Sequence, residues 1–250
     1  RWELRDLQMV TIDGEDAKDL DDAVSGRKLP NGNHELGVHI ADVSHYVVSG
    51  QAIDNEAYKR GTSVYLVDRV VPMLPEVLSN GICSLNAHED RYAMTCMMEI
   101  NKDGKVVHYR IRPSIIHVGR RCSYKEVYKA LEENIIPDDL QDFMPMLRDL
   151  AEISKFLNAM RRRRGALDFD FPEYKVLLDH DGTPLRIVKR DRTMAERLIE
   201  ECMLIANETV ATHLEHTHHT SVYRIHEHPS EEKLDLFQKV LNYLGQNLVL

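Results

Sequence analysis

The stretch that organises the chain is Leu7-Gln-Met-Val-Thr-Ile-Asp13-Gly-Glu-Asp-Ala-Lys-Asp19-Leu-Asp21-Asp22. Its apolar beginning predicts a short buried strand. Six of its last ten positions are carboxylates, and Lys18 is the only cation among those ten. Because like charges repel and a desolvated carboxylate is costly, such a segment usually requires a cation. The stretch therefore predicts a metal site at the end of a strand.

The ligand type indicates which metal this would be. A carboxylate site without Cys or His suits Mg²⁺, Mn²⁺ or Ca²⁺ better than zinc. The calcium-loop pattern fails, because its third acidic position would be Ala17 when counted from Asp13. We predict Mg²⁺, with Mn²⁺ as an alternative, and a carboxylate group of this kind also meets the needs of a two-metal phosphodiester site. The competing interpretation is a solvated acidic loop.

Composition sets broad limits on the protein. With 250 residues and 43% apolar content, the chain can form one large domain or two small ones. The formal net charge of −9 is unusual for a nucleic-acid binder, unless the acids are concentrated at a metal site. Four widely spaced cysteines without a C-x-x-C pair predict a reduced, cytoplasmic protein. No signal peptide or long apolar run predicts secretion or a membrane partner.

Local sequence signals predict a mixture of strands and helices. Ser123 and Glu126 form a capping box, residues 101–104 a hairpin turn, and Gly61 a helix stop. Strands are predicted at 7–12, 35–43, 91–100, 106–118, 174–178, 185–189 and 222–225, and helices at 51–60, from 123, at 138–164, 194–215 and from 230 to about 245. The mixture predicts a single α/β (α+β) domain with an open, mixed, largely antiparallel sheet flanked by helices.

Several segments resemble one known family. Residues 11–23 closely resemble the signature of the RNase II/RNase R exoribonucleases, and the resemblance is strongest to the bacterial RNase R branch. It continues, in the family's order, at 38–46, 60–75, 81–85, 165–169 and 198–208. The resemblance implies an RNB-type catalytic domain over 1–250. It also implies Mg²⁺-dependent hydrolysis of single-stranded RNA from the 3′ end, releasing nucleoside 5′-monophosphates and sparing DNA.

The resemblance also implies roles for individual residues. Asp13, Asp19 and Asp22 match metal ligands, and Asp21 matches the metal-site aspartate tied most directly to the chemical step. The aromatic rings that stack on the 3′-terminal bases match Tyr65 and Phe169, and the acid that contacts the terminal sugar matches Glu200. A π-face accepts any base, which suits an enzyme indifferent to sequence.

Several of these positions have alternatives on residue chemistry alone. Phe169 would then be a core residue, and Glu201 is assigned to structure because Arg197 precedes it by four positions. A cationic group could follow an RNA backbone or consist of helix-end and hairpin charges: Arg161 to Arg164, Arg186, Lys189, Arg190, Arg192 and Arg197. A second group is interpreted as a polar connection rather than a zinc site: His213, His216, His218 and His219.

The family pattern extends further than this sequence. A Ser-Pro-Ile-Arg-Arg-Tyr-like segment, whose arginine contacts the scissile phosphate in the family, has no counterpart here, and neither do the flanking OB-fold domains. We therefore expect a catalytic domain that is incomplete at its C-terminus and weakly active or inactive by itself. The alternative function is a catalytically silent RNA-binding fragment of the same fold.

Overall fold

The computed structural model describes residues 1–167, 169, 171–190 and 192–246. The chain divides into two compact units, Arg1–Val210 and Ala211–Leu250. The first unit contains the sheet and most helices, and the second contains the end of α4 (Met194–His216) and α5 (Glu231–Tyr243).

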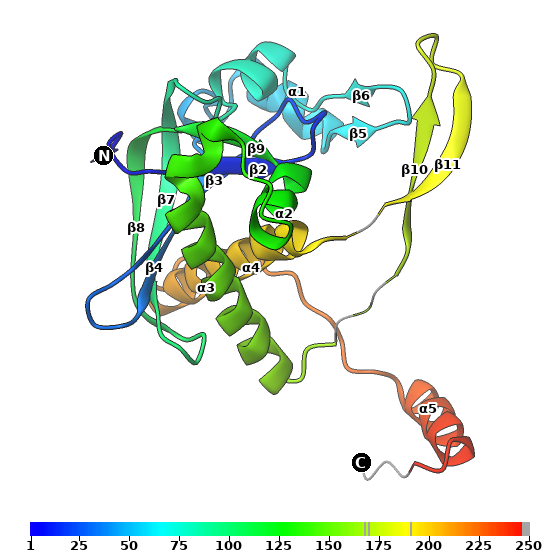
Figure 1. Ribbon diagram of the computed structural model, residues 1–250. Helices are drawn as coiled ribbons and strands as arrows, with labels where there is room; N and C mark the ends of the chain where they lie inside the picture. Colours follow the sequence, from blue (N-terminus) through cyan, green and yellow to red (C-terminus); the bar gives the residue numbers. More distant parts are fainter. Residues whose placement is uncertain (168, 170, 191, 247–250) are drawn as a thin grey trace. The chain divides into compact units, whose positions relative to one another are not determined.

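A seven-stranded sheet forms the centre of the first unit, in the order β1-β8-β7-β4-β3-β2-β9 (Figure 1). The four pairs in the middle are antiparallel, whereas the outer pairs β1–β8 and β2–β9 are parallel. This arrangement confirms the predicted mixed, largely antiparallel sheet. The strands are β1 (Trp2–Leu4), β2 (Val10–Asp13), β3 (Asp22–Lys28), β4 (His34–Ala41), β7 (Asp90–Ile100), β8 (Val106–His117) and β9 (Arg120–Ser123).

Two small hairpins stand apart from this sheet. One consists of β5 (Val64–Tyr65) and β6 (Val70–Val71), and the other of β10 (Glu173–Leu178) and β11 (Pro184–Arg190). The second hairpin consists of the two strands that were predicted at 174–178 and 185–189. The helical elements are η1 (Val43–His45), α1 (Ala52–Arg60), η2 (Val77–Ile82), α2 (Tyr124–Glu132), η3 (Asp138–Phe143) and α3 (Met144–Arg163), with α4 and α5 as above.

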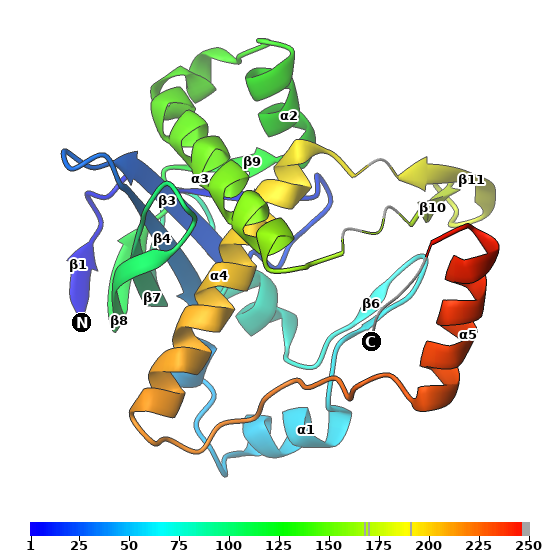
Figure 2. The same cartoon turned by 90° about the horizontal axis from the view of Figure 1, so that it is seen from below.

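Alternation along the strands separates two buried layers. On one face, Val24, Leu36 and Met98 pack against α2, α3 and the first part of α4, which cross that face in Figures 1 and 2. On the other face, Ala23 and Ala93 belong to a smaller cluster with Met9, Leu20, Ala41, Leu85, Ile116 and Val118. The helices therefore cover one face of the sheet, as predicted.

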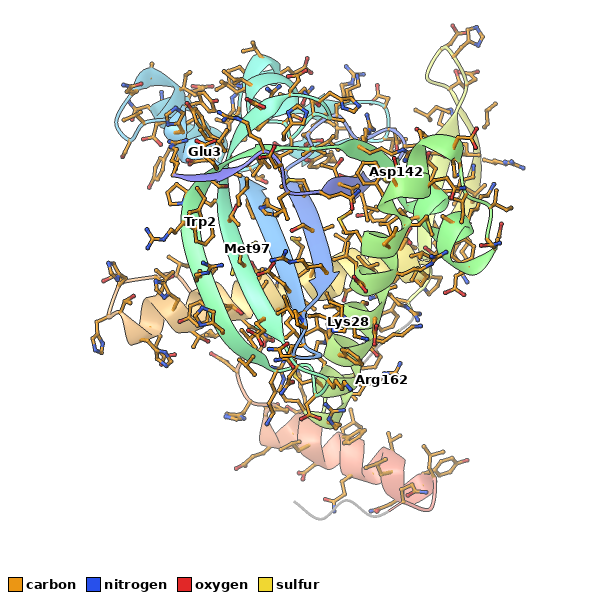
Figure 3. All side chains as sticks on the ribbon, turned by 60° about the vertical axis from the view of Figure 1, so that its left-hand side comes forward. Trp2, Glu3, Lys28, Met97, Asp142 and Arg162 are labelled. Carbon is orange, nitrogen blue, oxygen red and sulfur yellow. The ribbon has the colours of Figure 1, made fainter. Side chains whose placement is uncertain are left out.

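Figure 3 shows where the sheet meets α3. Lys28, at the end of β3, lies beside the helix, and its backbone N–H donates to Asp149 Oδ2 at 3.1 Å. Gly26 lies under the same helix, where an added Cβ would come within 2.8 Å of Leu150 Cδ2. The β3–β4 hairpin and α3 are thus packed closely enough to place their side chains in direct contact.

Two predicted elements differ from the structure. The strand at 222–225 is wrong: these residues form neither helix nor strand, and Val222 is 99% exposed. The helix at 138–164 begins as the 3₁₀ turn η3, and the α-helix starts at Met144. Pro145, which cannot donate an intrahelical hydrogen bond, fits the first turn of α3 but not the middle of a longer helix.

Candidate functional site

The acidic loop, residues 13–22, connects β2 to β3 and is anchored from beneath. Asp13 ends β2 and Asp22 begins β3. Between them, Leu20 is buried in the smaller core, and its N–H donates to Ser84 Oγ at 3.0 Å. Ser84 Oγ in turn donates to the carbonyl of Lys18 at 3.1 Å. The loop thus holds its acidic side chains at the sheet end while its apolar side chain packs inward.

Arg121 fixes the other half of the loop. Its guanidinium donates to the carbonyl oxygens of Gly14, Glu15 and Ala17 at 3.4, 3.1 and 2.7 Å. Arg121 reaches them because β9 runs parallel to β2, which pairs Arg121 with Thr11. Sequence reasoning missed both Arg121 and Ser84. Only the Gly81–Leu85 motif of the family resemblance pointed toward Ser84, and no local signal pointed toward Arg121.

The loop brings Asp13, Asp19, Asp21 and Asp22 into electrostatic contact. Burial, together with the charges of Asp13 and Asp21, raises the pKa of Asp22 to about 6. The pKa of Asp21 is also raised, first by burial and then by Asp19 and Asp13. Burial and the neighbouring charges therefore make Asp21 and Asp22 harder to ionise, and a bound cation would relieve this effect.

The spacing of these four side chains limits how they would hold an ion. Across the described residues, only two groups place three ligand atoms within 4.8 Å of one another, and the four aspartates are not among them. An octahedral Mg²⁺ with bonds of about 2.1 Å needs its ligands closer than that. In this arrangement no more than two aspartates would ligate one ion directly, leaving positions for water and phosphate oxygens. That fits the usual protein site for Mg²⁺.

Tyr65 is joined to the acidic loop, whereas Phe169 and Glu200 are not. The Tyr65 hydroxyl donates to Asp19 Oδ2 at 3.1 Å, and this bond raises the pKa of Tyr65. Phe169 is 61% exposed and stacks on Phe171 with ring centroids 5.4 Å apart. The assignment of Phe169 to the core on residue chemistry alone is therefore wrong. No hydrogen bond or ion pair within the described ranges links Phe169 or Glu200 to the aspartates.

Glu200 and Glu201 both lie on α4 and face arginines. Glu200 pairs with Arg192, and its Oε1 lies 3.8 Å from Arg161 Nη1. Glu201 is 3% exposed, lies 3.5 Å from Arg161 and accepts from Asn158 Nδ2 at 2.9 Å. Glu201 thus serves structure as expected, but through these two partners on α3 rather than through Arg197.

The arginines at the end of α3 are largely engaged within the protein. Arg164 donates to both carboxylate oxygens of Glu208, at 2.9 and 2.7 Å, and Arg163 donates to the carbonyl of Asp103 at 2.6 Å. Arg161 is also held, by carboxylates on α4. For Arg161, Arg163 and Arg164, these contacts favour a structural role over a role in following the RNA backbone. The side chain of Arg190 and residue 191 lie outside the described part of the chain.

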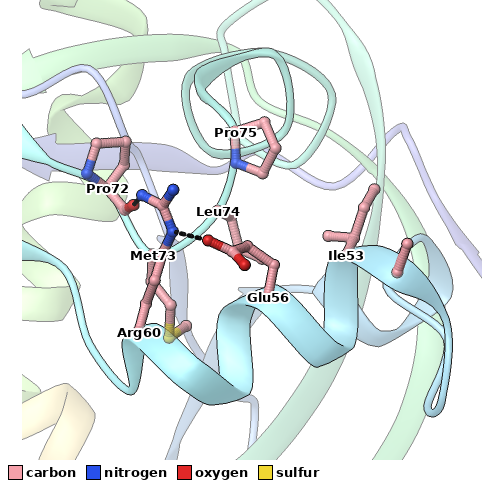
Figure 4. Close-up of a pocket in the computed structure, with 8 residues that line it drawn as sticks. Ile53, Glu56, Arg60, Pro72, Met73, Leu74 and Pro75 are labelled. Carbon is pink, nitrogen blue, oxygen red and sulfur yellow. Dashed lines mark hydrogen bonds and ion pairs between the residues drawn. The ribbon is translucent and has the colours of Figure 1, made fainter.

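Two cavities open beside the small hairpins. One, of about 410 Å³, lies between α1 and residues 72–75, where Arg60 bridges Glu56 and the Pro72 carbonyl (Figure 4). The other, of about 510 Å³, lies between the β5–β6 and β10–β11 hairpins and is lined by Val67, Val176 and Ile187 among others. The four aspartates, Tyr65, Phe169 and Glu200 line neither cavity, whereas Arg186 of the cationic group lines the second.

Comparison with known proteins identifies the family. The family model of the RNB domain matches residues 1–249. The chain belongs to the RNB domain family. This RNB domain is 50% identical over 246 residues to Ribonuclease R of Thermotoga maritima, covering 98% of the chain and 35% of that relative. The family resemblance of the sequence is thereby confirmed.

Solved structures agree with this membership. Mycoplasma genitalium RNase R in complex with ribose methylated single-stranded RNA matches with a TM-score of 0.93 and 35% identity, covering 98% of this RNB domain and 38% of that chain. Yeast Ssd1, described as a pseudonuclease, matches with a TM-score of 0.79 but 19% identity, covering 100% of this chain and 30% of that one. The second likeness shows the fold alone. The RNB domain spans about a third of the length of these proteins.

Two further sequence expectations can be compared with the structure. All four cysteines are buried and free, as predicted from their spacing. Within the described ranges, no helix combines the length and the apolar character needed to cross a bilayer.

Proposed function

We propose that this RNB domain is the catalytic domain of a Mg²⁺-dependent 3′-to-5′ exoribonuclease that hydrolyses single-stranded RNA to nucleoside 5′-monophosphates. The observation that carries the proposal is the acidic loop, in which burial and the charges of neighbouring aspartates raise the pKa values of Asp21 and Asp22. Negative charge that is crowded in this way destabilises the fold unless a bound cation compensates it. Family membership supplies the reaction class.

The aspartates would divide the work at this site. Asp13, Asp19 and Asp22 would hold Mg²⁺, at most two of them directly and the third through a water ligand. When bound, the ion supplies the positive charge and Lewis acidity that phosphodiester hydrolysis needs. Asp21 would take up the proton of the attacking water. The Tyr65 hydroxyl would hold Asp19 in one orientation through the 3.1 Å bond between them.

RNA would be bound through stacking and a sugar contact. Tyr65 and Phe169 both expose most of their ring surface, as a platform for bases requires. Glu200 would accept a hydrogen bond from the terminal ribose, which distinguishes RNA from DNA. Its side chain is 41% exposed, so the carboxylate is open to a ligand although it pairs with Arg192. The cellular setting consistent with this function is the cytoplasm.

The first test is a gel assay with 5′-labelled single-stranded RNA and the 250-residue chain. We expect weak shortening from the 3′ end that requires Mg²⁺, stops in EDTA, and falls at least about a hundredfold in Asp21→Asn because a proton acceptor is lost. Glu15→Gln is the matched control. Glu15 lies in the same loop but is exposed and lies 3.6 Å from Lys125, so its activity should match the parent.

The same assay distinguishes the rival functions. RNA that binds but stays intact in Mg²⁺ would fit both a truncated enzyme and the silent RNA-binding module, whereas equal shortening by Asp21→Asn and Glu15→Gln would contradict the role of Asp21. Restoring the arginine segment of the family downstream of this chain then separates a truncated enzyme, which gains activity, from a silent module, which does not. Equal shortening of an RNA that ends in a 2′-deoxynucleotide would contradict the sugar contact at Glu200.

A further inference from the structure

A second group of potential metal ligands lies where the β3–β4 hairpin meets α3. His34 begins β4, and Asp149 and Glu152 lie three positions apart on α3, which puts them on one helix face. One ligand atom from each of the three lies within 4.8 Å of the other two. The other such group in the described part of the chain consists of consecutive residues, 179–181, in the β10–β11 turn, where chain proximity alone explains the cluster.

His34 is the unusual member of this cluster. It is fully buried, yet neither of its ring nitrogens has a hydrogen-bond partner among the described residues. Nε2 faces Glu152 Oε2 at 3.4 Å, which is beyond the usual range of an N–H···O hydrogen bond. Buried polar groups are almost always paired. His34 therefore has the donor atoms, the burial and the direction of a ligand.

His39, on the same strand, shows what a purely structural histidine looks like here. It is equally buried, but its Nε2 lies 3.1 Å from Ser25 Oγ and its Nδ1 lies 2.8 Å from Thr95 Oγ1. Burial lowers its pKa to about 3, so the imidazole is neutral at pH 7. Both of its ring nitrogens have hydrogen-bond partners. The two histidines differ in what faces them, which is hydroxyls for His39 and carboxylates for His34.

The distance between His34 and Glu152 matches a tetrahedral metal. Two ligands bonded to zinc at about 2.1 Å at the tetrahedral angle lie about 3.4 Å apart. That is the separation of His34 Nε2 and Glu152 Oε2. The Lys28 N–H donates to Asp149 Oδ2, which orients this carboxylate. The Phe156 ring packs edge-on against the imidazole, with centroids 5.7 Å apart.

We propose that His34, Asp149 and Glu152 form a second metal site, which takes a divalent transition metal of the zinc type with water as the fourth ligand. An imidazole nitrogen with two carboxylate oxygens suits Zn²⁺ and disfavours Mg²⁺, unlike the all-carboxylate acidic loop. Glu152 is 45% exposed and provides the entry path from solvent. A bound ion would tie the β3–β4 hairpin to α3 and stabilise the folded chain.

The test measures zinc binding to the 250-residue chain by calorimetry in excess Mg²⁺, which occupies the carboxylate-only sites. We expect Glu152→Gln and Asp149→Asn each to weaken one zinc-binding event at least about tenfold. Both variants should fold, since Glu152 is half exposed and the amide oxygen introduced by Asp149→Asn can still accept from the Lys28 N–H. Glu132→Gln, an exposed acid at the end of α2, is the matched control and should bind as the parent does.

Thermal unfolding gives a second readout that is independent of nuclease activity. Zinc should raise the midpoint of the parent and of Glu132→Gln, and raise it less in Glu152→Gln and Asp149→Asn. Zinc that binds to other histidines affects all four proteins equally, so it does not contribute to the differences in affinity or midpoint shift between them. Equal zinc affinities and equal midpoint shifts in all four would overturn the proposal, as would a parent that binds no zinc. His34 and Glu152 would then be an ion pair and nothing more.

Discussion

Two acidic regions of the first unit use the same residue types to opposite electrostatic effect. In the acidic loop, carboxylates face one another, and the pKa of Asp22 rises to about 6. On α4, carboxylates face arginines, and the bidentate bond from Arg164 lowers the pKa of Glu208. One region is destabilised by its charge and the other is held by it. Carboxylates without a cationic partner therefore indicate the site better than the number of acidic residues does.

The largest expected effect comes from removing a buried acid on α4. Glu201→Ala removes the partner of Asn158 and the nearer of the two carboxylates that face Arg161, and breaking a buried pair in this way costs about 3–5 kcal/mol. Urea unfolding monitored by circular dichroism measures the loss. Glu200→Ala is the neighbouring control: Glu200 is 41% exposed, so its removal should cost less than about 1 kcal/mol. Equal losses in the two variants would contradict the distinction between them.

Removing an acid from the acidic loop should raise the stability of the fold, whereas removing Glu201 lowers it. Asp22 has a pKa of about 6 in the folded chain against an ordinary value of 3.8, so the folded state binds this proton more tightly than the unfolded state. Its contribution to stability is therefore lost as pH rises from about 4 to 6 and stays lost above that. In EDTA at pH 8, Asp22→Asn should stabilise the fold by up to about 3 kcal/mol.

The same variant at pH 4 provides the check on the sign. There Asp22 is protonated in the folded chain, so the gain from Asp22→Asn should shrink toward zero. Glu15→Gln, which removes an exposed charge from the same loop, should change stability by less than about 0.5 kcal/mol at either pH. A variant that is less stable than the parent in EDTA at pH 8 would show that the Asp22 charge is compensated within the protein.

Tyr65 separates stacking from charge at the edge of the acidic loop. In an Asp21→Asn background, Tyr65→Ala should weaken binding of a short single-stranded RNA by about 1–3 kcal/mol, because a ring face is lost. Tyr65→Phe keeps the ring and removes only the hydroxyl that donates to Asp19, so it should retain most of the affinity. Fluorescence anisotropy measures both. If the Phe variant binds as poorly as the Ala variant, the hydroxyl matters and stacking does not.

The smallest effect is expected where the compensated charges are exposed. Arg164 and Glu208 are 54% and 42% exposed, so Arg164→Gln should cost less than about 1 kcal/mol of stability despite the bidentate geometry. It should also leave RNA affinity nearly unchanged, because this arginine is already occupied. A large loss of affinity, with a smaller salt dependence of binding, would instead return Arg164 to the phosphate-tracking role.

What the sequence predicted well depended on short-range chemistry. The capping box of Ser123 and Glu126 forms as expected, and Gly61 ends α1 with a positive φ of 75°. The four aspartates meet because one loop carries them all. The sequence could not predict the parallel strand pairs at the sheet edges, because β1 pairs with a strand more than a hundred residues away. The hydrogen bonds from Arg121 to the acidic loop were missed for the same reason, since they also join distant parts of the chain.

The errors came from propensity without tertiary partners. Residues 222–225 have the composition of a strand, but a strand needs a neighbour to pair with, and none in the described part of the chain pairs with this segment. Phe169 has the composition of a core residue, yet it is exposed beside Phe171. In both cases side-chain type predicted burial that only the three-dimensional contacts could decide.

The bonds from Arg121 to the loop have a consequence for protein engineering. The guanidinium holds the carbonyl oxygens of Gly14, Glu15 and Ala17, and every amino acid carries such an oxygen. These three bonds are thus independent of the side chains that stand at positions 15 and 17. A library that randomises position 15 can therefore vary the surface of the loop while every member keeps the carbonyl contacts to Arg121.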